Sequence, residues 1–169
     1  VRQVIHVLGE TQEVYTIVDP GEGVRKPRAI FFPIEKVMGG MAGELIGAGI
    51  RSSRIAEKCK FPHVTFFYNG FDAGAEGAGH CIPTIPEHEI GAKPEMALGA
   101  VTETILEKLA DPEERYVVAN ICNLDQVGHL GRLDVATQAA TAVDAAFTKI
   151  VESARKHGWS LIVTSDHGC

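Results

Sequence analysis

The chain has 169 residues, of which 45% are hydrophobic and 22% charged, and its formal net charge is −6. This composition is typical of a soluble globular protein, and the scattered lysines and arginines argue against a nucleic-acid-binding surface. No apolar run reaches the roughly 18 residues of a membrane span, and no basic-then-apolar leader is present. We therefore expect a cytoplasmic protein with neither nucleic acid nor a membrane as its partner.

The first half of the chain alternates short apolar runs with glycine- and proline-rich stretches. Glycines within residues 38–49 weaken an otherwise helical pattern, because each costs about 1 kcal/mol against alanine inside a helix. Residues 63–70 are ambiguous between strand and helix. The expected elements are strands at 4–8, 29–32 and 53–56, a weak helix within 38–49, a flexible loop at 70–80 and an extended segment at 81–94.

The second half predicts two amphipathic helices and two strands. Apolar residues recur three or four positions apart over residues 95–110 and 134–156, and Gly158 stands where a helix-ending glycine is expected. One apolar run, at 116–122, lies between the two helices, and a second, at 159–164, follows the later helix. Strand and helix in alternation predict an α/β fold with a mostly parallel sheet and crossover helices.

The four cysteines, Cys59, Cys81, Cys122 and Cys169, have no Cys-x-x-Cys spacing. Free thiols in a reducing compartment are the simplest interpretation. A zinc cluster is not expected, since only His80 stands beside a cysteine.

Two clusters of carboxylate and imidazole follow the last two predicted strands. Residues 123–129 read Asn-Leu-Asp-Gln-Val-Gly-His, and residues 165–168 read Ser-Asp-His-Gly. Asp125 and His129 are four apart, which places both on one face of a helical turn. Asp166 and His167 come directly after the other strand, and parallel strands collect ligands at their carboxyl ends. These four residues predict a divalent-metal site, although a capping aspartate, an exposed histidine and an ordinary turn would explain each cluster alone.

Other candidate residues are less specific. Lys60 by itself is most simply a solvated surface charge. The histidines His63, His80, His88 and His157 have no partner at ligand spacing and are expected to be structural or exposed. No serine stands in a Gly-x-Ser-x-Gly elbow, so no nucleophile is predicted.

Residues 54–70, Arg-Ile-Ala-Glu-Lys-Cys-Lys-Phe-Pro-His-Val-Thr-Phe-Phe-Tyr-Asn-Gly, resemble a long motif of the cofactor-independent phosphoglycerate mutases. Residues 93–96 (Lys-Pro-Glu-Met) and both metal-type clusters follow in the same order as in that family. The resemblance implies an alkaline phosphatase-like α/β sheet, incomplete in this chain. It also implies an isomerase that interconverts 3-phosphoglycerate and 2-phosphoglycerate through a phosphoserine intermediate, in glycolysis and gluconeogenesis.

The same resemblance implies roles for particular residues. Asp125 and His129 correspond to ligands of one metal ion, and Asp166 and His167 to ligands of a second. Lys60 corresponds to an active-site lysine that contacts the substrate phosphate, which reverses its interpretation as a surface charge. The expected cofactors are two divalent ions, Mn²⁺ before Mg²⁺, Co²⁺ or Zn²⁺, with no organic cofactor, in a protein that is a monomer at full length.

The resemblance also implies a domain layout. Residues 1–32 correspond to the end of an inserted phosphotransferase domain with its hinge, and residues 33–169 correspond to part of the phosphatase-like metal-binding domain. The chain starts at Val1 and stops at Cys169, directly after the Asp-His-Gly motif, so we expect a C-terminal-half fragment that is inactive alone. Cys169 departs from the family pattern and fits the phosphopentomutases of the same superfamily. Another phosphomutase and a non-catalytic metal-binding remnant therefore stay open.

Overall fold

The computed structural model describes residues 13–18, 27–33, 35, 37, 39–71 and 78–168. The chain divides into two compact units, residues 1–36 and 37–169. Its elements in chain order are the strands and helices β1 (Tyr15–Val18), β2 (Ala29–Phe32), α2 (Met41–Gly47), β3 (Ser52–Glu57), α3 (Phe61–Val64), β4 (Ala78–Ile82), the 3₁₀ helix η1 (Glu87–Glu89), α4 (Leu98–Ala110), β5 (Tyr116–Asn120), α5 (Asn123–Gly128) and α6 (Leu133–Lys156). In the first unit, β1 and β2 form a parallel pair. None of the helices described is long and apolar enough to cross a membrane.

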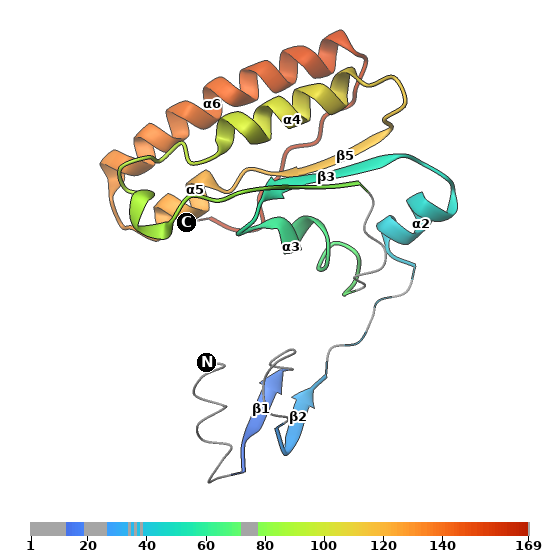
Figure 1. Ribbon diagram of the computed structural model, residues 1–169, viewed down its shortest axis with the longest axis vertical. Coiled ribbons are helices and arrows are strands. Elements are labelled where there is room, and N and C mark those ends of the chain that lie inside the picture. The colour runs from blue at the N-terminus through green and yellow to red at the C-terminus, as the bar shows by residue number, and fades with distance from the viewer. Residues whose placement is uncertain are drawn as a thin grey trace. The chain divides into compact units, whose positions relative to one another are not determined.

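The second unit is built on a parallel sheet with the strand order β4-β3-β5. Strand β3 is central and all of its residues are buried. Helices α4 and α6 lie on one face of this sheet and α3 lies on the other (Figure 1). The expected α/β architecture with parallel strands and crossover helices is confirmed.

The main core joins the sheet to the two long helices. Ile55 of β3 is fully buried against Val101, Ile105 and Leu109 of α4 and Ile150 of α6. The α4 residues recur at helical spacing, which places them on the one face that meets the sheet. Burial of this stripe holds α4 against β3.

Helix α6 ends as its sequence predicts. Gly158 adopts a positive φ of 75°, and the Trp159 backbone N–H donates to the Ala154 carbonyl at 2.8 Å. A left-handed glycine after the last turn, with a hydrogen bond reaching back across it, is the Schellman ending of a helix. The Trp159 indole N–H also donates to the Leu109 carbonyl at 2.8 Å, which ties the end of α6 to the end of α4.

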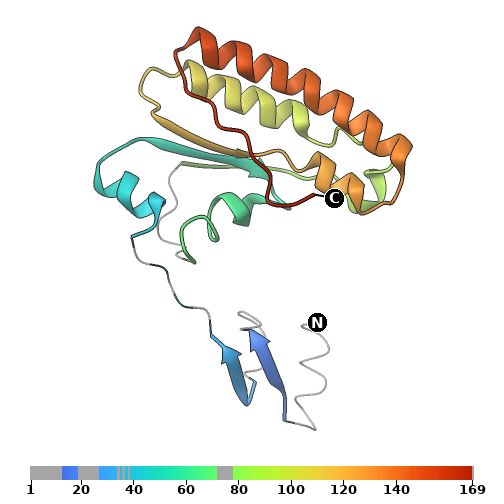
Figure 2. The ribbon, with the colours of Figure 1, turned by 180° about the vertical axis from the view of Figure 1, so that it is seen from behind.

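The predicted strand at 159–164 is wrong. These residues have no regular structure, and the chain runs from the end of α6 towards α5 as an irregular segment (Figure 2). Ile162 is 90% exposed and Val163 is 65% exposed. A strand requires a neighbour that pairs with its backbone groups, and among the described strands β5 pairs only with β3.

Other boundaries also differ from the predictions. Strand β4 begins at Ala78, inside the predicted flexible loop at 70–80. Helix α4 begins at Leu98 and not at residue 95, because Met96 has a φ of 47°, which is outside the helical region. The 81–94 segment is not extended throughout, since Pro86 opens a 3₁₀ turn in which the Glu89 N–H donates to the Pro86 carbonyl. The ambiguous residues after Lys60 form the short helix α3 and further turns. The predicted strand at 4–8 lies outside the described residues.

Candidate metal centre

Lys60 and Asp125 meet at the carboxyl edge of the sheet. Strands β3 and β5 are parallel neighbours, so both end at the same edge. Lys60 closes the turn that follows β3, and Asp125 lies in the first turn of α5, which follows β5. The Lys60 Nζ lies 2.8 Å from the Asp125 Oδ2, and the two side chains are only 18% and 20% exposed. Parallel pairing has thus joined two residues that are far apart in the sequence.

This ion pair shifts both groups towards their charged forms. The hydrogen bond from Lys60 lowers the pKa of Asp125, and a weaker one from Gln126 acts in the same direction. The hydrogen bond to Asp125 raises the pKa of Lys60, and the charges of Asp125 and Asp166 add to this effect. Lys60 is therefore a fixed ammonium, and Asp125 a fixed carboxylate, at neutral pH.

Two imidazoles face the other oxygen of the same carboxylate. The Nε2 atoms of His129 and His167 lie 3.6 Å and 3.8 Å from the Asp125 Oδ1. The His167 Nε2 also lies 3.6 Å from the Asp166 Oδ2. His129 belongs to the α5 turn, whereas Asp166 and His167 come from the irregular C-terminal segment. The structure therefore brings all five residues singled out from the sequence into one cluster, although it lacks the predicted strand before the last two.

The cluster has the donor chemistry of a metal site. Separations of 3.6–3.8 Å are too long for hydrogen bonds. The 3.6 Å between Asp125 and His129, and between Asp166 and His167, is close to the roughly 3.4 Å between two ligand atoms that each lie about 2.1 Å from a tetrahedral ion. The His167 Nδ1 lies 2.9 Å from the Gly168 carbonyl, which accepts only if Nδ1 carries the proton. That tautomer leaves the Nε2 lone pair free for a cation, as in metal-binding histidines held by a backbone carbonyl.

The segment before α4 supports both strand ends. The Ala97 N–H donates to the Glu57 Oε1 at 3.0 Å, at the end of β3. The Asn123 Nδ2 donates to the Pro94 carbonyl at 2.9 Å, at the start of α5. Glu57 and Asn123 are each 1% exposed, so these hydrogen bonds are shielded from water. Pro94 of the Lys-Pro-Glu-Met motif and Ala97 directly after it thus have a structural role, since they hold the two turns that present Lys60 and Asp125.

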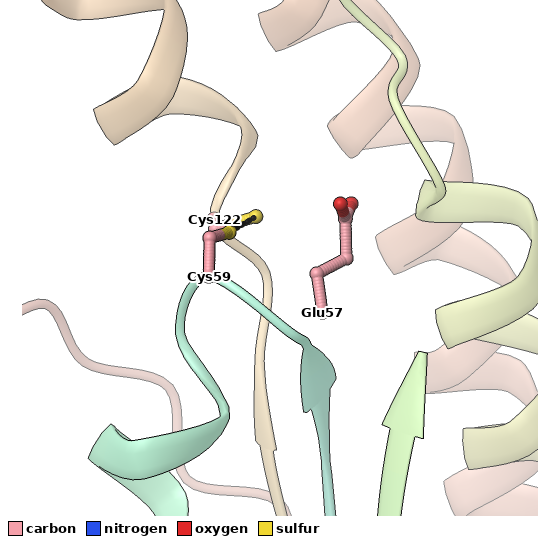
Figure 3. A group of neighbouring side chains, drawn as sticks. All are labelled: Glu57, Cys59 and Cys122. Atoms are coloured by element: carbon pink, nitrogen blue, oxygen red, sulfur yellow. Dashed lines mark hydrogen bonds between the residues drawn. The ribbon is translucent and has the colours of Figure 1, made fainter. Parts of the chain in front are cut away.

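A second group of polar side chains was not predicted. Glu57, Cys59 and Cys122 place their carboxylate and sulfur atoms within 4.8 Å of one another (Figure 3). The cysteines are 63 positions apart and lack any zinc-type spacing, so no local pattern indicated their proximity. The available signal was topological, because Cys59 comes shortly after the predicted strand at 53–56 and Cys122 ends the predicted strand at 116–122, in a sheet that was expected to be mostly parallel.

The fold and the cluster define a class of protein, an α/β domain with carboxylate and imidazole donors at the carboxyl edge of a parallel sheet. Residues 41–169 match the model of the metalloenzyme superfamily. The chain therefore belongs to the metalloenzyme superfamily.

The similar proteins agree with the resemblance found in residues 54–70. A 2,3-bisphosphoglycerate-independent phosphoglycerate mutase of Thiobacillus denitrificans is 34% identical over 144 residues, which are 83% of this chain and 28% of that protein. A protein of the same name from Streptomyces coelicolor is 41% identical over 132 residues, 77% of this chain and 26% of that protein. The crystal structure of Leishmania mexicana phosphoglycerate mutase at low cobalt concentration matches with a TM-score of 0.69 and 25% identity, covering 82% of this chain and 29% of that one.

These comparisons confirm the predicted family resemblance and fold class. The chain spans less than a third of the length of the curated relatives that it matches.

Proposed function

We propose that residues 37–169 supply part of the active site of a metal-dependent phosphoglycerate mutase, an isomerase that interconverts 3-phosphoglycerate and 2-phosphoglycerate through a phosphoserine intermediate. The observation that carries this proposal is the convergence of Lys60, His129 and His167 on the Asp125 carboxylate at the sheet edge. The names of the relatives support the substrate, and the donor set supports the metal dependence. The remaining groups of the site belong to the parts of those relatives that this chain does not span.

Asp125, His129, Asp166 and His167 would hold two divalent ions, of which Mn²⁺ is the expected one. When bound, such ions supply positive charge that stabilises the oxygens of a transferring phosphoryl group. A divalent ion of this type is also supported by the mutase neighbour whose crystal structures were determined at low cobalt concentration.

The side chains of this chain have complementary tasks in the proposed reaction. Lys60 is held as an ammonium by Asp125, so it can donate hydrogen bonds to phosphate oxygens without first gaining a proton. A phosphoryl group in transfer spreads negative charge over its oxygens, and a positioned cation stabilises that charge. The Asp125 Oδ2 orients the ammonium, while Oδ1 remains directed towards the imidazoles.

Metal binding by the 169-residue chain tests the ligand assignment directly. Titration with Mn²⁺, followed by calorimetry and electron paramagnetic resonance, should show binding that Asp125→Asn and His167→Ala each weaken by at least about tenfold. His88→Ala is the matched control, because His88 is exposed on η1 and outside the cluster. Circular dichroism should show the same helix content in all variants, since ligand loss leaves the core intact.

Turnover tests the reaction. In a full-length protein that contains this chain, an enolase-coupled assay should detect phosphoglycerate interconversion that Lys60→Ala and His167→Ala abolish. Activity on phosphopentoses in its place would indicate the phosphopentomutase alternative. Absence of Mn²⁺ binding by the parent chain, or equal binding by Asp125→Asn, would contradict the proposed metal centre.

A further inference from the structure

Glu57, Cys59 and Cys122 form a compact group beside the proposed metal centre, which we call the thiol–carboxylate cluster. Cys59 follows β3 and is exposed, whereas Cys122 precedes α5 and is buried. Their sulfur atoms lie 3.7 Å apart and extend towards the side on which the Glu57 carboxylate stands (Figure 3). The Cys59 N–H donates to the Thr84 hydroxyl at 3.1 Å, which fixes the backbone of the exposed member.

The sulfur separation is the one that a tetrahedral cation requires. With Zn–S bonds of about 2.3 Å and a tetrahedral angle, two thiolate sulfurs stand about 3.8 Å apart. The observed 3.7 Å matches this without movement of either cysteine. A carboxylate oxygen on the same ion would stand about 3.6 Å from each sulfur. The carboxylate oxygen of the cluster is already within 4.8 Å of both sulfurs, so a small side-chain adjustment completes the arrangement.

A buried oxygen without a partner points to a ligand at the same place. Glu57 is 1% exposed, and its Oε1 accepts from the Ala97 N–H, but its Oε2 makes no hydrogen bond of normal geometry among the described residues. The Thr84 hydroxyl and the Cys122 thiol lie near enough to the carboxyl to oppose the rise in its pKa. An unpaired buried carboxylate oxygen is costly unless a proton or a cation neutralises it. Burial raises the pKa of Glu57 and of the Cys122 thiol, so a cation that bound here would displace protons from the cluster.

We propose that Glu57, Cys59 and Cys122 bind one thiophilic divalent cation of the Zn²⁺ type, with a water as the fourth ligand on the exposed side of Cys59. Two thiolates and one carboxylate favour zinc over manganese or magnesium, which prefer oxygen donors. This site is distinct from the cluster around Asp125, which has only oxygen and nitrogen donors. It does not depend on the proposed mutase activity.

A cation bound to the thiol–carboxylate cluster would also restrain the neighbouring Lys60–Asp125 ion pair. Cys59 immediately precedes Lys60, and Cys122 lies three residues before Asp125. An ion shared by the two cysteines would cross-link the turn after β3 to the turn before α5. It would thereby restrain the two backbone segments that hold the Lys60–Asp125 ion pair.

Cobalt spectroscopy of the reduced 169-residue chain tests the proposal, because sulfur-to-cobalt charge-transfer absorption reports thiolate ligands. The cluster around Asp125 has only oxygen and nitrogen donors, so Co²⁺ bound there does not produce this absorption. We expect one equivalent of Co²⁺ to produce this absorption and Zn²⁺ to abolish it by displacement. Cys59→Ser should weaken the binding that gives the absorption by at least about tenfold. Glu57→Gln should weaken it while both sulfurs remain.

Two controls separate this site from other causes. Cys81→Ser changes an exposed cysteine of β4 and should leave the absorption unchanged. Asp125→Asn should also leave it unchanged, even where Mn²⁺ binding is lost, so failure of the mutase proposal and failure of this one are distinguishable. Absence of the charge-transfer absorption, or its persistence in Cys59→Ser, would overturn the proposal. Peroxide-driven formation of a Cys59–Cys122 disulfide in a chain that shows no Co²⁺–thiolate absorption would also overturn it, in favour of a redox pair.

Discussion

Replacement of Lys60 by methionine should tighten divalent-metal binding while it removes turnover. Methionine keeps most of the length and apolar character of the lysine stem but carries no charge. The Lys60 ammonium lies 2.8 Å from the Asp125 Oδ2, so an ion bound to the same carboxylate feels its repulsion. Removal of the ammonium also leaves Asp125 free to direct its full charge at the ion.

The size of the effect follows from Coulomb's law. The ion and the ammonium lie on opposite oxygens of the Asp125 carboxylate, since Oδ2 holds Lys60 and Oδ1 faces the imidazoles. A metal–oxygen distance of about 2.1 Å and the 2.8 Å between Nζ and Oδ2 then place the ammonium about 6 Å from the ion. A divalent cation and a unit charge at that distance repel by about 1.4 kcal/mol in the dielectric of water, and by more in a partly buried site. The Lys60 and Asp125 side chains are only 18% and 20% exposed, so the value for water is the smaller bound. We therefore expect Mn²⁺ to bind Lys60→Met at least about tenfold more tightly than the parent chain.

Calorimetric titration of Mn²⁺ at low ionic strength measures this difference. The matched control is Lys58→Met, which removes the same charge from an exposed position two residues away. The difference between the two variants should shrink as salt is added, because ions screen charges that are not fully buried. Mn²⁺ binding by Lys60→Met that is no tighter than by Lys58→Met would refute the placement of the ion beside Asp125.

Three further predictions concern the fold. Ile105→Ala removes a buried side chain of the core between β3, α4 and α6, so it should lower the free energy of unfolding by about 2–5 kcal/mol in urea titrations. Ile162→Thr changes a side chain that is 90% exposed and should alter the free energy of unfolding by less than about 0.5 kcal/mol. A loss above about 1 kcal/mol in the threonine variant would show that residues 159–164 are packed in solution. Burial raises the pKa of Glu57 above 4.5, so the folded state keeps the carboxyl proton to a higher pH than the unfolded state does. The stability of the metal-free chain should therefore fall as the pH rises from about 4.5 through the pKa of the folded state. Glu57→Gln should remove that fall in denaturation measured with a chelator between about pH 4.5 and 7.5, and an unchanged pH profile would count against the burial of an ionisable carboxyl.

Local patterns in the sequence were sufficient for the long helices. The apolar stripe of α6 extends over 24 residues, and its glycine ending depends only on neighbouring residues. The same holds for the turn that carries Asp125 and His129, since four-residue spacing on a helix decides their proximity. These features were predictable because each is settled by hydrogen bonds and side chains within a few positions of one another.

Strand formation at 159–164 could not be decided in this way. The apolar run has the composition of a strand, but a strand exists only when a neighbour pairs with its backbone. The start of α4 was likewise misplaced, because Met96 has a φ of 47° and the Glu57 carboxylate, 40 positions away, accepts the N–H of the next residue, Ala97. Such outcomes depend on contacts between distant segments.

By itself the sequence determined the class of fold, the two metal-type clusters and the family that they resemble, because motif spacing and periodicity depend on residues that lie close together in the sequence. Only the tertiary structure decided that Lys60 pairs with Asp125, that His129 and His167 face the same carboxylate, and that Cys59 meets Cys122 beside Glu57. The physical reason is the parallel pairing of β3 with β5, which brings the ends of two strands, more than 60 positions apart, to one edge of the sheet.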